Sequence, residues 1–167
     1  MRLKIRVGAF SLVELLVVVG IVSILATIGI PAYQDYIKRT RVAESLVAAK
    51  AVANRVADNV LNGVVPLSSG IGTPLPSTAW WSLSINAAVG NVDINYPAAK
   101  WGQSYNIAIS LRTRGADGVL GQVELGVIPD GKLVYACRAA GAGGPAWWNP
   151  LPVKWVPPEC AGGNTYY

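Results

Sequence analysis

Residues 10–30 read FSLVELLVVVGIVSILATIGI, and this stretch decides the fold of the chain. At 1.5 Å per residue, a helix made of it would be roughly 31 Å long, about the thickness of the hydrocarbon core of a bilayer. Glu14 is the only ionisable side chain within it. Because an unpaired carboxylate is costly in hydrocarbon, Glu14 needs a partner and indicates a function.

The residues before this stretch resemble the start of an export signal. Arg2, Lys4 and Arg6 place Met1–Ala9 in the cytoplasm by the positive-inside rule and send the rest of the chain outward. Three interpretations compete: a signal peptide cut after its apolar core, a permanent signal anchor, and cleavage before Phe10. The run is too long for the first, and the second gives Glu14 no purpose. The third retains the whole apolar segment in the mature chain.

Two short segments carry a resemblance to a known family. GAFSLVELL at Gly8–Leu16 and IPAYQDY at Ile30–Tyr36 resemble the N-terminus of a type IV pilin precursor, of the type IVa-like major pilin kind, and the match covers residues 7–41. The resemblance implies that a prepilin peptidase removes a leader of residues 1–9 and N-methylates the new amine. The processing residues would then be Ala9 and Phe10.

The leader departs from the family pattern at one position. The usual residue before the cut is glycine, whereas alignment on Phe10 and Glu14 puts Ala9 there and Gly8 one place earlier. Cleavage after Gly8 would make Glu14 the sixth mature residue instead of the fifth. We expect the Ala9–Phe10 bond to be cut, because a small alanine can enter the pocket that takes glycine. Substituting Ala9 by glycine should then raise the processing rate.

The resemblance also implies an assembly role for Glu14. Its carboxylate would meet the Phe10 amine of a neighbouring subunit, and subunits docked out of register would leave both charges unpaired in an apolar core. The alternative is that Glu14 pairs only with its own N-terminus, one helical turn away.

The rest of the chain predicts an α+β fold. Apolar residues recur with spacings of four and three beyond the membrane segment, which indicates one buried helix face, and Asn62-Gly63 supplies a stop. We expect one long N-terminal helix, which has an apolar half and an amphipathic half. This helix would pack on an antiparallel sheet of about four strands, and a disulfide-bounded loop would follow at the C-terminus. The expected regions are a cleaved leader (1–9), a transmembrane or filament-core half (10–30), an amphipathic half (31–62), a connecting loop (63–104) and a sheet with the disulfide region (105–167). The positions of the buried helix face are Val42, Leu46, Ala49, Ala53, Val56 and Val60.

Three strands are expected after the connecting loop. Residues 105–111 alternate between apolar and polar side chains, residues 119–127 place apolar residues on one face, and residues 132–138 follow the turn Pro129-Asp130-Gly131. Within the connecting loop we expect at most one short element, at residues 80–85.

Both cysteines, Cys137 and Cys160, lie near the C-terminus. An export-type N-terminus and a glycine- and proline-rich segment between them favour a disulfide in an oxidising compartment over two free thiols. By the family resemblance this loop would tie the chain end to the sheet and face outward.

The composition argues against an enzyme. The chain has no histidine, and only 14% of its residues are charged. Asp117, Glu124 and Asp130 are too sparse for a calcium loop, and we expect no metal site, cofactor or catalytic residue. The paired tryptophans at 80–81 and 147–148, with Trp101 and Trp155, are expected to pack loops onto the sheet; stacking on sugars or bases is the alternative.

These observations predict a structural subunit of a type IV pilus. It would be an inner-membrane precursor that assembles with other pilin subunits into an extracellular filament of a Gram-negative bacterium, with adhesion, twitching motility or DNA uptake as filament properties. The expected partners are the prepilin peptidase/N-methyltransferase and the inner-membrane assembly machinery, and binding of nucleic acid by this chain alone is not expected. The alternatives are a minor pilin or type II secretion pseudopilin, and an exported monomeric carbohydrate-binding module.

Overall fold

The computed structural model describes residues 10–117, 119–139, 149–161 and 165–166. The chain divides into two compact units, Met1–Ile37 and Lys38–Tyr167. The second unit is called the head below. The helix α1 (Leu12–Leu61) begins in the first unit and ends in the head, and it is continuous through Pro31.

The end of α1 is closed by a glycine, as the sequence predicts. Gly63 has a φ of +63°, and its N–H donates to the Val60 carbonyl at 3.1 Å. The Val64 N–H donates to the Asn59 carbonyl at 2.9 Å. These two bonds form a Schellman motif, which satisfies carbonyls that have no partner inside the helix.

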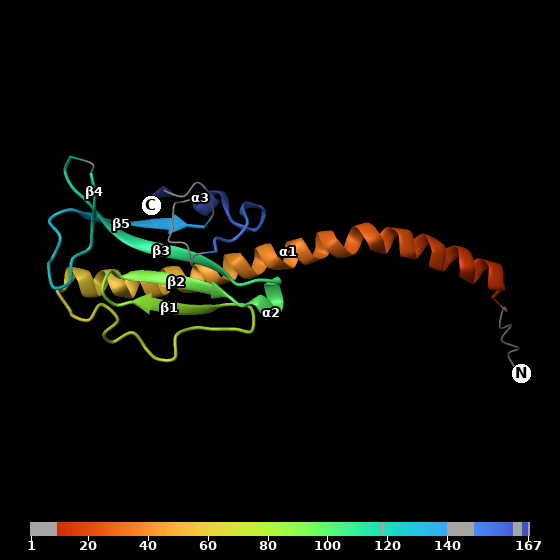
Figure 1. The fold of residues 1–167 in the computed structure, drawn as a ribbon, viewed down its shortest axis with the longest axis horizontal. Coiled ribbons are helices and arrows are strands. Elements are labelled where there is room, and N and C mark those ends of the chain that lie inside the picture. The colour runs from red at the N-terminus through yellow and green to blue at the C-terminus, as the bar shows by residue number, and fades with distance from the viewer. Residues whose placement is uncertain (1–9, 118, 140–148, 162–164, 167) are drawn as a thin grey trace, which may run out of the picture. The chain divides into compact units, whose positions relative to one another are not determined.

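The head is built from one antiparallel sheet and the C-terminal half of α1 (Figure 1). The sheet order is β1-β2-β3-β5-β6, and β4 pairs with β3. β2 pairs with the first half of β3, and β4 pairs with residues 112–114 of the same strand. β4 therefore lies on the same side of β3 as β2, beyond the point where β2 ends. The strands are β1 (Ser82–Asn86), β2 (Asn91–Tyr96), β3 (Tyr105–Arg114), β4 (Leu120–Gln122), β5 (Lys132–Arg138) and β6 (Thr165–Tyr166).

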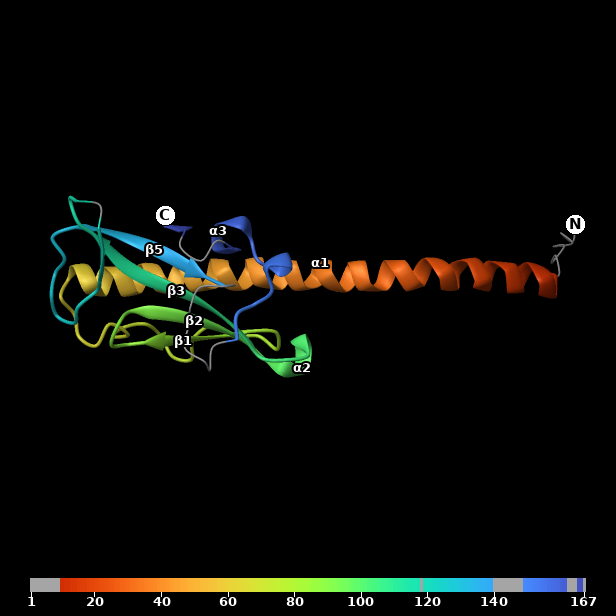
Figure 2. The same ribbon diagram turned by 45° about the horizontal axis from the view of Figure 1, so that its top comes forward.

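The core of the head lies between the sheet and one face of α1, and two views of the ribbon show the sheet lying along this part of the helix (Figures 1 and 2). All six apolar positions predicted for the buried helix face are buried. The facing strands contribute alternate residues, such as Ile94 of β2 opposite Ile107 of β3 and Ile109 opposite Cys137 of β5. The predicted α+β class, with a long helix packed on an antiparallel sheet, is confirmed.

Two parts of the sheet differ from the sequence-based expectation. Residues 63–104, expected to be a connecting loop with one short element, contain β1, β2 and the short helix α2 (Ala98–Trp101). The strand expected over residues 119–127 is only β4, and Val119, Leu125 and Val127 are exposed. Gly126 has a φ of +74°, a conformation that interrupts an extended strand.

The chain end is attached to the sheet by the expected disulfide. Cys137 of β5 is bonded to Cys160 of the short helix α3 (Pro158–Ala161), with 4.9 Å between their Cα atoms. Between them, the 3-10 helix η1 (Val153–Trp155) packs Trp155 into the core, and both sulfur-bearing residues are buried.

Candidate assembly interface

The apolar N-terminal part of α1 is exposed along residues 12–30, except for a partly covered Ala26. Its hydroxyl groups are satisfied within the helix, because Ser23 donates to the Val19 carbonyl at 2.7 Å and Thr27 to the Ser23 carbonyl at 2.9 Å. Among the described residues, α1 is the one helix long and apolar enough to cross a membrane. An apolar surface of this extent requires lipid or protein around it.

Glu14 closes the first turn of α1. The helix begins at Leu12, and the Glu14 carboxylate accepts a hydrogen bond from the backbone N–H of Ser11 at 3.1 Å. A serine followed three residues later by a glutamate is the capping-box pattern, in which the glutamate returns to the N-cap backbone. The sequence reasoning did not use this pattern, although Ser11-Leu12-Val13-Glu14 displays it. One carboxylate is therefore placed where the N-terminal N–H groups of the helix favour negative charge.

Of the two residues of the expected cleavage bond, the structure describes Phe10. Ala9, like Gly8, lies outside the described residues. Phe10 lies before the first helical residue and is exposed. The position of the cleavage bond remains a prediction from the sequence.

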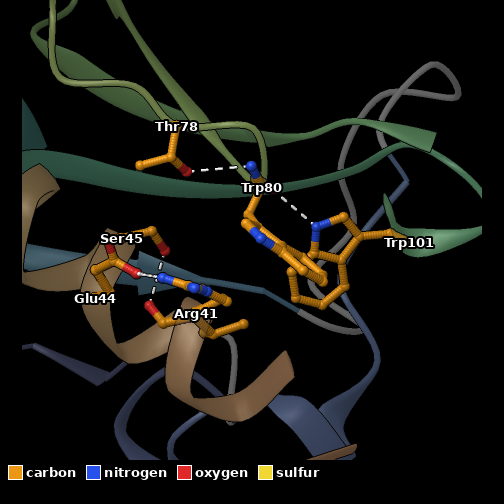
Figure 3. Close-up of polar contacts among 7 residues, drawn as sticks. Arg41, Glu44, Ser45, Thr78, Trp80 and Trp101 are labelled. Atoms are coloured by element: carbon orange, nitrogen blue, oxygen red, sulfur yellow. Dashed lines mark hydrogen bonds and ion pairs between the residues drawn. The ribbon is translucent and has the colours of Figure 1, made fainter. Parts of the chain in front are cut away.

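Three tryptophans from separate segments of the chain meet at one end of the head. Trp101 of α2 lies edge-to-face against Trp80 and Trp155, with centroid separations of 6.3 and 5.6 Å. The Trp101 indole N–H donates to the Trp80 carbonyl at 2.9 Å, and Thr78 accepts from the Trp80 backbone N–H (Figure 3). Trp101 and Trp155 also contact Tyr96 of β2 and Tyr105 of β3, so the cluster packs against the sheet as the sequence predicts. Trp147 and Trp148 lie outside the described residues.

Cationic side chains cover this tryptophan cluster. The Lys38 ammonium lies 4.2 Å from the Trp155 ring centroid, and Arg41 lies 5.7 Å from that of Trp80. Arg41 also forms an ion pair of 2.8 Å with Glu44, one turn further along α1 (Figure 3). Such contacts combine the attraction of a cation to the ring face with burial of the aliphatic stem.

Burial perturbs three titratable groups of the head. It raises the pKa of Tyr96 strongly, although the hydrogen bond of 2.7 Å to Ser45 acts in the opposite direction. Burial also raises the pKa of Asp93 on β2, and it raises the pKa of Tyr135 together with the charge of Asp58. Tyr135 donates to Asn54 of α1 at 2.8 Å. The two tyrosines join the sheet to the helix through Ser45 and Asn54.

Within the described ranges, no three acidic or cysteine residues come close enough together to hold a metal ion. Asp117, Glu124 and Asp130, judged too sparse for a calcium loop from the sequence, lie outside the strands, between β3 and β5.

Known proteins are similar to the N-terminal portion of this chain. The chain is 50% identical over 54 residues to the type IV major fimbrial protein FimA of Dichelobacter nodosus, covering 32% of this chain and 34% of the relative. It is 39% identical over 70 residues to the type IV major pilin protein PilE1 of Neisseria gonorrhoeae, covering 41% and 33%. It is 44% identical over 54 residues to a fimbrial protein of Moraxella nonliquefaciens, covering 32% and 35%.

These matches span about a third of the length of the relatives. No protein-family model matches the chain, and no solved structure matches it significantly. The similarity lies in the N-terminal portion, and the head shares with the expected pilin architecture a helix packed on an antiparallel sheet with a C-terminal disulfide. Together, the N-terminal homology and this α+β architecture support the type IV pilin that the sequence predicts.

Proposed function

We propose that this chain is a structural, non-catalytic subunit of a type IV pilus, which polymerises through its N-terminal helix into a surface filament. The observation that carries the proposal is the exposed apolar segment of α1 with its single carboxylate, in the portion shared with fimbrial proteins. Adhesion, twitching motility and DNA uptake are the filament properties to which the subunit would contribute.

The apolar segment accounts for two successive environments of the subunit. In the precursor, lipid would surround residues 10–30, and the cationic residues before them would hold the N-terminus at the cytoplasmic face of the inner membrane. In the filament, the same surface would be covered by the corresponding helices of neighbouring subunits. The head would then lie outside this helical core, in a pilus of a Gram-negative bacterium.

Glu14 would set the register between neighbouring helices. Cleavage before Phe10 by a prepilin peptidase/N-methyltransferase creates an amine, and the carboxylate of Glu14 would pair with the amine of the next subunit. Before assembly, the Ser11 N–H would give this carboxylate a hydrogen-bond partner within its own subunit. Pairing across subunits is favoured because a shifted subunit would leave two charges unpaired in an apolar core. The inner-membrane assembly machinery would present the subunits to one another.

The test separates the charge of Glu14 from its capping bond. Glu14→Gln keeps an acceptor for the Ser11 N–H but removes the charge, whereas Glu14→Leu removes both. Glu44→Gln is the matched control, because Glu44 is an exposed glutamate on the same helix. We expect both Glu14 variants to be inserted and processed but to give few sheared filaments, and Glu44→Gln to assemble normally.

Normal filament yield from Glu14→Gln would contradict the charge-pairing role and leave only the helix cap. Processing is measured separately, by intact mass and N-terminal sequencing of the chain from its host. A chain that starts at N-methylated Phe10 is the expected product, and Ala9→Gly should shorten the processing time course. A start near or beyond Ala26 would indicate ordinary signal-peptide cleavage and contradict the pilus proposal.

A further inference from the structure

Cations from three separate segments converge on the tryptophan cluster at one end of the head. Lys38 and Arg41 come from α1, Lys100 from the end of α2 and Lys154 from η1. The Lys100 ammonium lies 5.5 Å from the Trp80 ring centroid, and that of Lys154 lies 4.7 Å from Trp155. We call the four cations together with Trp80, Trp101 and Trp155 the basic aromatic patch; Figure 3 shows its Arg41, Trp80 and Trp101.

The basic aromatic patch begins close in the chain to the end of the apolar segment. Lys38 lies only eight residues after Ile30 in the chain. Tyr33 and Tyr36 lie in this interval and are each 65% exposed. Tyrosines just beyond an apolar span are typical of a segment at the membrane–water interface.

We propose that the basic aromatic patch docks the head on anionic phospholipid headgroups of the membrane that holds the apolar helix. The inference rests on the membrane-anchored precursor state of the proposed function. Lysine and arginine attract the phosphate of the headgroup, while their aliphatic stems tolerate the boundary with the acyl chains. Docking would hold the head at the bilayer surface until the subunit is extracted for assembly.

The burial of the rings favours lipid over nucleic acid. Trp101 is 4% exposed and Trp155 is 7% exposed, and cations lie over the rings. A strand of nucleic acid needs open ring faces on which its bases can stack. A headgroup needs only the cations, which lie over the ring faces of the tryptophan cluster.

The experiment places the full chain in nanodiscs of phosphatidylcholine, with or without a minority of phosphatidylglycerol. All tryptophans of the chain lie in the head, so quenching of tryptophan fluorescence by headgroup spin-labelled lipid reports its approach to the bilayer. We expect stronger quenching with phosphatidylglycerol, and loss of the difference at high salt. Lys100→Gln with Lys154→Gln should lower the docked-to-undocked ratio by about fivefold per cation removed.

The matched control is Lys50→Gln with Lys132→Gln, which removes the same charge elsewhere on the head. Lys132 pairs opposite Arg114, at the end of β3 far from Tyr105 and the patch. Equal quenching in both lipids, or equal loss in both double variants, would overturn the inference. So would patch substitutions that weaken binding of a DNA oligonucleotide while leaving lipid quenching unchanged, because the patch would then be a nucleic-acid surface.

Failure of the chain to incorporate into nanodiscs would overturn the membrane-anchored state and the docking with it. Incorporation without lipid-dependent quenching would overturn the docking alone. Because the quenching is measured on single subunits, a defect in filament assembly does not alter this readout. Near-ultraviolet circular dichroism of each variant, compared with the parent, confirms that the head remains folded.

Discussion

At Gly90, the turn of the β1–β2 hairpin packs closely against α1. Substitution of this glycine tests the packing of the head. Its φ is +68°, and a Cβ there would lie 3.2 Å from both Leu67 Cδ1 and Val56 Cγ1. Both neighbours are fully buried, so neither can move aside without disturbing the core. Gly70 has the same φ of +68° but nothing within 4 Å of its Cβ position. The pair Gly90→Ala and Gly70→Ala therefore separates crowding from backbone strain.

The expected magnitudes follow from these two terms. A left-handed conformation costs alanine roughly 1 kcal/mol more than glycine, and this cost applies to both variants. The change in the unfolded chain is also shared, so it cancels in the comparison. Overpacking a core adds about 1–3 kcal/mol, and this term applies to Gly90→Ala alone. We expect losses in unfolding free energy of about 1 kcal/mol for Gly70→Ala and about 3 kcal/mol for Gly90→Ala.

Urea unfolding of the full chain in a nonionic detergent measures the difference. Tryptophan fluorescence follows the head, because all tryptophans lie there. The denaturant slope should be the same in parent and variants, so that a shifted midpoint reports stability. Losses for the two variants within about 0.5 kcal/mol of each other would refute the contact between the hairpin turn and the helix.

Three further predictions concern the same head and the same unfolding assay. Substitution of Cys137 and Cys160 by serine should lower the unfolding free energy by about 3 kcal/mol, because the bond closes a loop with a sequence separation of 23; an unchanged midpoint would contradict this. Tyr96→Phe removes the buried bond to Ser45 and should lower it by about 1 kcal/mol; a neutral result would show that Ser45 is satisfied without it. Asp93→Asn should raise stability at neutral pH. Burial raises the pKa of Asp93 above its ordinary 3.8, so the gain should shrink as the pH falls through the raised pKa; a gain that persists below pH 3.8 would argue against ionisation as the cause.

The helix and its attachments were predictable because their signals are local. The spacing of apolar residues from Val42 to Val60 indicates the buried face, and Asn62-Gly63 indicates the stop that the Schellman motif forms. The hairpin of β1 and β2 was not predictable in this way. Its sequence, SLSIN and NVDINY, is short and rich in serine and asparagine, and its strands are stabilised by pairing with each other and with β3.

The sequence by itself determined the properties that depend on neighbouring residues along the chain: an apolar helix with one carboxylate, an amphipathic continuation, and a disulfide-bounded C-terminus. Only the tertiary structure decided which residues from distant segments meet. Trp80, Trp101 and Trp155 are separated widely in the chain. The contacts of Trp101 and Trp155 with Lys38 depend on how α2 and η1 lie on the head. Periodicity records which face of an element is apolar, but it holds no information about which other element covers that face.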